Sequence, residues 1–144
     1  MKTTIFTIIA ALFIFSTGSL FAQNGWGKGS NYNNLYDTKT VETISGTVTK
    51  IDKIYPDKNS SYGVHLTITT SNGDMNVHLG PAWYIENQDI QIVKDDNVTV
   101  TGSKVTYDGS YVIIAKEVTK GDQVLKLRDD DGYPLWSGWR NKNR

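Results

Sequence analysis

Two histidines, His65 and His78, are the residues of this chain best suited to chemistry. Neutral imidazole nitrogens bind zinc or copper, so a pair on one face of a sheet could form part of a divalent metal site. Two ligands leave the coordination of such an ion incomplete, and no third soft ligand is apparent nearby. The favoured alternative is that both histidines are polar-face residues hydrogen-bonded to threonines.

The periodicity around the histidines predicts two paired strands. Apolar residues alternate with polar ones: Val64, Leu66 and Ile68 on the first strand, then Met75, Val77 and Leu79 on the second. Asn72-Gly73 between them is a strong hairpin signal, because both residues tolerate positive φ. With these two residues as the loop, Leu66 faces Leu79. On the polar face, His78 then faces Thr67, and His65 is the diagonal neighbour of His78.

The second strand ends in the tract VHLGPAWY (residues 77–84), where an aromatic pair follows Gly80-Pro81. Proline cannot donate to a strand ladder and favours a helix start, so a short helix is expected over residues 82–87. Trp83 and Tyr84 could stack on a sugar or a base. Either could instead plug the end of a barrel, which is favoured for Trp83 and left open for Tyr84. We therefore predict a ligand-binding site at His65, His78, Trp83 and Tyr84.

No enzyme constellation is found in the sequence. No nucleophile-elbow pattern occurs, and the chain has no cysteine for a thiolate nucleophile, a thiolate metal site, a disulfide or covalent c-type haem. The carboxylates of residues 129–131 lack the twelve-residue calcium-loop pattern. We expect a non-catalytic protein with no cofactor, apart from a possible divalent metal at the histidine pair.

The N-terminus is typical of an exported protein. Lys2 precedes an apolar core at residues 5–15, and small residues follow up to Ala22, so residues 1–22 are expected to be a cleaved signal peptide. The apolar run is shorter than the roughly 20 residues of a membrane span. We expect a secreted or periplasmic protein with no membrane span after cleavage. Residues 23–39 then form a flexible leader, and residues 138–144 a C-terminal tail.

The charge balance narrows the class of partner. Fifteen basic residues include Lys2, so the mature chain would carry 14 against 15 acidic residues. Binding to a phosphate backbone needs a basic surface, and none is indicated here. The expected partner is an envelope protein or a small ligand, and oligomeric state is left open.

The remaining pattern predicts one all-β domain over residues 40–137. Five main strands are expected, with the short helix between the third and fourth and an extra strand near the C-terminus. The inward phase slips by one residue between Val48 and Ile51 and again between Gly102 and Val105, as expected for bulged, bent strands that contain a glycine. This order fits the five-stranded Greek-key barrel called the OB-fold, and a β-sandwich explains the helix position less well.

Four tracts resemble a known family of exported bacterial OB-fold proteins. They are VETISGTV (41–48), VHLGPAWY (77–84), VTVTGS (98–103) and LRDDDGYPLW (127–136). Together they are similar to the domain shared by the magnetosome proteins MamS and MamX, over most of residues 36–137. The resemblance implies a non-catalytic secreted or periplasmic module. Some members are redox-linked through haem at cysteine motifs, a role that this cysteine-free chain cannot share.

Three hypotheses about function follow. The leading one is an exported OB-fold binding or interaction module of undefined ligand. The second is a periplasmic metal-handling or redox accessory protein that uses His65 and His78. The third is a nucleic-acid or oligosaccharide binder on the barrel face.

Overall fold

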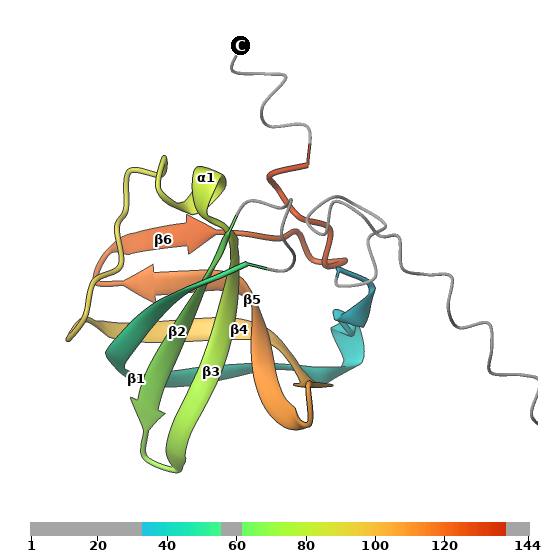
Figure 1. Ribbon diagram of the computed structural model, residues 1–144, viewed down its shortest axis with the longest axis horizontal. Helices are drawn as coiled ribbons and strands as arrows, with labels where there is room; N and C mark the ends of the chain where they lie inside the picture. The colour runs from blue at the N-terminus through green and yellow to red at the C-terminus, as the bar shows by residue number, and fades with distance from the viewer. Residues whose placement is uncertain (1–32, 56–61, 138–144) are drawn as a thin grey trace, which may run out of the picture.

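A computed structural model of the protein describes residues 33–55 and 62–137 (Figure 1). Its strands are β1 (Val41–Ile54), β2 (Gly63–Thr70), β3 (Gly73–Pro81), β4 (Asn97–Tyr107), β5 (Ser110–Lys120) and β6 (Gln123–Lys126). The helix α1 (Ala82–Ile85) lies between β3 and β4, and the 3-10 turns η2 (Asn33–Leu35) and η3 (Thr38–Thr40) precede β1. The predicted signal peptide, the first part of the predicted leader and the predicted tail lie outside the described residues.

The strands form one six-stranded sheet that closes on itself. Neighbouring strands follow the order β3-β2-β1-β4-β5-β6, and all these pairs are antiparallel. A short parallel ladder joins β3 to β5, from Asn76–Val112 to His78–Ile114, and completes a ring of five strands. With α1 between β3 and β4, this is the OB-fold arrangement, and β6 is the expected extra strand. The predicted fold class is confirmed.

Two strands, β1 and β4, take part in both halves of the ring, and both bend at bulges. In β1 the register shifts between Val48 and Lys50, and in β4 it shifts between Thr101 and Gly102. The first shift lies at the predicted phase slip between Val48 and Ile51, and the second lies immediately before the slip predicted between Gly102 and Val105. A Cβ on Gly46 would lie 2.3 Å from the carbonyl oxygen of Thr69, and one on Gly102 would lie 2.3 Å from that of Ile114. Both glycines are therefore needed because a neighbouring backbone passes close to them.

The predicted register of the β2–β3 hairpin is wrong by two residues. Thr70 pairs with Gly73, so the loop consists of Ser71 and Asn72. The side chain of Thr70 holds this turn, because its Oγ1 accepts a hydrogen bond from Asn72 N at 3.1 Å and donates to Gly73 O at 2.7 Å. A shift of two residues keeps every side chain on its predicted face. It does change partners, so Leu66 faces Val77 rather than Leu79.

The β4–β5 hairpin has the register that an Asp-Gly loop favours. Asp108 and Gly109 form its loop with φ of 52° and 85°, and Val105 pairs with Val112. Positive φ at both loop positions is the geometry that suits the twist of a tight hairpin.

The first half of β5 is buried on both faces. Ile113 and Ala115 belong to the main core inside the ring, whereas Val112 and Ile114 are buried without being part of it. Ile114 pairs with the buried Ser103 of β4, whose Oγ accepts a hydrogen bond from Asp37 N at 2.9 Å. The turns before β1 therefore cover the outer side of the ring here. Within residues 33–55 and 62–137, no helix is long and apolar enough to cross a membrane.

The close approach at Gly102 gives a stability test. Gly102→Ala should lower the free energy of unfolding by about 3 kcal/mol, because the new methyl group overlaps a backbone carbonyl that no rotamer change can move. Gly109→Ala is the matched control: its Cβ would meet nothing within 4 Å, and its positive φ should cost only about 1 kcal/mol. Equal losses in urea unfolding would contradict the barrel geometry.

Candidate functional site

The two histidines form a stacked pair on the outer face of the ring. His65 of β2 pairs directly with His78 of β3, which corrects the predicted diagonal arrangement. Their rings lie 3.6 Å apart between centroids and only 7° from parallel. Tyr107, at the end of β4, meets the His78 ring edge-on at 5.2 Å. His78 is 4% exposed, while His65 is partly exposed, so a ligand can reach the pair through His65.

Both imidazoles are neutral at physiological pH. Burial lowers the pKa of His65 to about 4, with Asp52 opposing the shift. Burial also lowers the pKa of His78 to about 3, and the nearby charges of His65 and Arg128 lower it further. Stacking at van der Waals distance is consistent with this neutrality, because two imidazolium rings in contact would repel each other.

The stacked geometry bears on the metal hypothesis. The lone pair of an imidazole nitrogen lies in the ring plane, so two parallel rings direct their lone pairs side by side rather than toward one ion. Across residues 33–55 and 62–137, no group of three or more His, Cys, Asp or Glu residues could hold a metal ion. A metal role for His65 and His78 stays a prediction, and it would require one ring to leave the stack.

A polar row crosses three strands at the histidines. Asp52 of β1 pairs with His65, which in turn pairs with His78. One step along the same face, Thr67 Oγ1 donates to Asn76 Oδ1 at 3.3 Å. The outer face of β2 and β3 therefore presents a partly exposed neutral imidazole beside hydroxyl, amide and carboxylate groups.

The aromatic pair on α1 divides into a buried ring and a half-buried one. Tyr84 is 6% exposed, its hydroxyl donates to Lys126 O at 3.2 Å, and its ring lies 5.7 Å from that of Trp136. Trp83 is partly buried against the core and meets Tyr84 edge-on at 6.5 Å. Tyr84, for which the sequence left the choice open, therefore fills the barrel end, whereas Trp83, favoured as the plug, is only partly buried against the core.

The C-terminal segment lies near both the histidine pair and the aromatic pair of α1. Trp136 is 2% exposed and lies against Gly80, where an added Cβ would come within 2.7 Å of its ring. The segment after β6 thus docks on the barrel through Trp136. The guanidinium of Arg128 lies 5.0 Å from the Trp136 ring, and its charge acts on His78.

Three residues around the histidines were not predicted as part of a site: Tyr107, Arg128 and Trp136. Arg128 is 3% exposed, and its Nη1 donates to Gly132 O at 3.0 Å. The position of Tyr107 can be inferred from the adjacent residues, because the Asp108-Gly109 hairpin places it at the end of β4. The neighbouring residues in the sequence do not indicate that Arg128 is buried, since its burial depends on contacts with distant segments.

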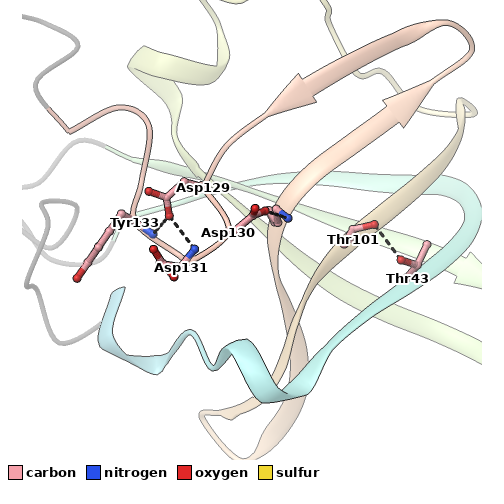
Figure 2. Close-up of polar contacts among 7 residues, drawn as sticks. Thr43, Thr101, Asp129, Asp130, Asp131 and Tyr133 are labelled. Atoms are coloured by element: carbon pink, nitrogen blue, oxygen red, sulfur yellow. Dashed lines mark hydrogen bonds and ion pairs between the residues drawn. The ribbon is translucent and has the colours of Figure 1, made fainter.

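The acidic turn after β6 is held by its own first carboxylate, as Figure 2 shows. Asp129 Oδ1 accepts hydrogen bonds from the backbone nitrogens of Asp131 at 2.9 Å and Tyr133 at 3.0 Å. Asp130 pairs with Lys116 of β5. Two of the three carboxylates thus hold the turn and its contact with the barrel. Thr43 and Thr101, also drawn, are hydrogen-bonded across β1 and β4 at 2.9 Å.

The histidine pair makes stability depend on pH. Both folded-state pKa values lie below the usual 6.5, so the unfolded chain binds more protons and stability falls as the pH drops below 6.5. From about pH 7.5 to about pH 5, the free energy of unfolding should fall by about 4 kcal/mol, roughly 2 per histidine. The chain has no other histidine, so His65→Gln should halve the change. Urea unfolding that shows no dependence over this range would contradict the burial of the pair.

Comparison with solved structures finds a chain of similar fold. A chain of the S. pombe Stn1–Ten1 complex is 21% identical, with a TM-score of 0.41, over 70% of this chain and 66% of that chain. The match therefore spans slightly less than two thirds of the yeast chain. No curated protein matches.

A family model does match, and it covers the site described above. The model of the MamS/MamX magnetosome protein family matches residues 40–125, which include the five-stranded ring, α1 and both histidines. Since this is more than half of the chain, the protein belongs to the MamS/MamX magnetosome protein family.

Proposed function

We propose that this MamS/MamX family member is an exported, non-catalytic binding module whose ligand contacts the outer face of β2 and β3. The observation that carries the proposal is the stacked pair of His65 and His78 with the edge of Tyr107 against it. OB-folds bind polymers on the face of their second and third strands, flanked by the β1–β2 and β4–β5 loops. Tyr107 stands at the β4–β5 hairpin, where such a flank is expected.

The environment of the titratable groups supports a binding role over catalysis. A general base works best with a pKa near the working pH, and the pKa values of both histidines lie far below 7. The carboxylates that make close contacts have structural partners: Asp129 holds its turn, Asp130 pairs with Lys116, and Asp96 pairs with Lys120 at 2.8 Å.

The face favours a partner that is not strongly charged. His65 offers a partly exposed neutral ring, and Thr67 with Asn76 offers hydroxyl and amide groups. The expected ligand is a small molecule or an envelope protein that stacks on His65 and hydrogen-bonds to these neighbours. Trp83 is partly exposed at the barrel end, so it offers the ligand a second contact besides His65.

Metal handling is the second candidate, and one observation favours it. Both imidazoles are adjacent and neutral, which is the protonation state that binds zinc or copper. The parallel stacking opposes it, as described above. We place the protein in the periplasm or outside the cell because residues 1–22 have the composition of a cleaved signal.

Site-specific photo-crosslinking in an exporting host tests the proposal. A photoreactive residue at Thr67 should give a discrete adduct in the envelope fraction, because Thr67 lies beside His65 on the proposed face. Thr99 of β4 is the matched control, since it is also a partly exposed threonine on a strand, and it should give none. His65→Ala should abolish the Thr67 adduct.

The same material tests export and the metal alternative. The recovered protein should begin at Gln23, and full-length chain confined to the cytoplasm would contradict export. Adducts of equal yield from Thr67 and Thr99 would overturn the proposed face. A zinc or copper ion in native mass spectra that is lost in both His65→Ala and His78→Ala would favour metal handling instead.

A further inference from the structure

We propose that a shallow groove at one end of the barrel binds a ligand that joins a planar apolar ring to a carboxylate or phosphate group. The groove lies between η3, the start of β1 and the β4–β5 hairpin, and its volume is about 460 Å³. Its lining residues are Lys39, Thr40, Val41, Glu42, Lys104 and Tyr111. Figure 1 shows the elements that carry these residues: the cyan turns before β1 approach the end of β4.

Two cations in the groove are available to an anion. Among the residues that the structure describes, Lys50, Lys116 and Lys120 form ion pairs, whereas Lys39 and Lys104 form none. A lysine that is not neutralised by a carboxylate attracts a ligand anion more strongly than a paired one, because no internal partner must first be displaced. The groove therefore has a net positive charge, even though Glu42 also lines it.

An exposed aromatic ring lies beside these cations. Tyr111 is 64% exposed, and Lys104 Nζ lies 4.8 Å from the centroid of its ring. Aromatic rings stack in offset or edge-to-face arrangements, so the open surface of Tyr111 can receive a planar ring. A ligand stacked there would bring its acidic group close to Lys104.

The wall that carries Lys39 is fixed to the barrel. Lys39 N donates to Asp37 Oδ1 at 2.8 Å, and Asp37 N donates to Ser103 Oγ at 2.9 Å. Thr40 Oγ1 and the same Ser103 Oγ lie 2.8 Å apart in a further hydrogen bond. Ser103 is fully buried in β4 and immediately precedes Lys104. The backbone at both lysines is therefore positioned before a ligand arrives, which lowers the entropic cost of binding.

Nuclear magnetic resonance titration of the purified protein with phenyl phosphate tests the proposal. Amide shifts should concentrate at residues 39–42, 104 and 111. Lys104→Gln should weaken binding about fivefold, as expected for one exposed charge contact. Glu42→Gln should strengthen binding, because it removes the carboxylate that repels the anion. Tyr111→Leu should remove the preference for phenyl phosphate over inorganic phosphate.

Separate probes distinguish the parts of the ligand. Inorganic phosphate and benzyl alcohol should each bind more weakly than phenyl phosphate, while benzoate should bind similarly if a carboxylate serves as well as a phosphate. Lys94→Gln, an exposed lysine outside the groove, is the matched control and should change nothing. Shifts spread over all lysines, or equal affinity in the Lys104→Gln and Lys94→Gln variants, would overturn the proposal.

Discussion

The parallel pairing of β3 with β5 is the interaction on which the rest of this structure depends. The other ladders of the ring are antiparallel, whereas this one is parallel. It joins strands that are separated in sequence by α1 and all of β4. It closes the ring with only three residue pairs and places His78 beside Ile114. Because the outer side of β5 is itself covered, His78 loses its contact with water there, and its low pKa follows from that burial.

Local patterns predicted the features that depend on local chemistry. Alternation placed the apolar residues of β2 and β3 on one face, the phase slips marked both bulges, and Asp108-Gly109 set the register of its hairpin. The β2–β3 turn was missed because the Thr70 side chain stabilises a loop one residue earlier than the Asn-Gly signal indicates. The burial of His78 was missed, and that of Tyr84 was left open, for another reason: their covering groups, Tyr107, Arg128 and Trp136, come from distant parts of the chain.

Family membership and fold leave the ligand open, so the function has to be inferred from particular surfaces. The outer face of β2 and β3 combines a partly exposed neutral imidazole with short polar side chains, which suits an uncharged partner. The groove beside η3 combines unpaired lysines with an exposed tyrosine, which suits an anion. The two surfaces share no lining residue, and each could be lost by substitution without the other.

Native-state hydrogen exchange tests the closure of the ring most directly. If β5 is buried on both faces and joined to β3, the amides of residues 112–115 should exchange only through global unfolding, whereas those of the edge strand β6 should exchange sooner by local opening. Exchange of residues 112–115 through local opening, at rates like those of β6, would show that β3 and β5 do not close the barrel.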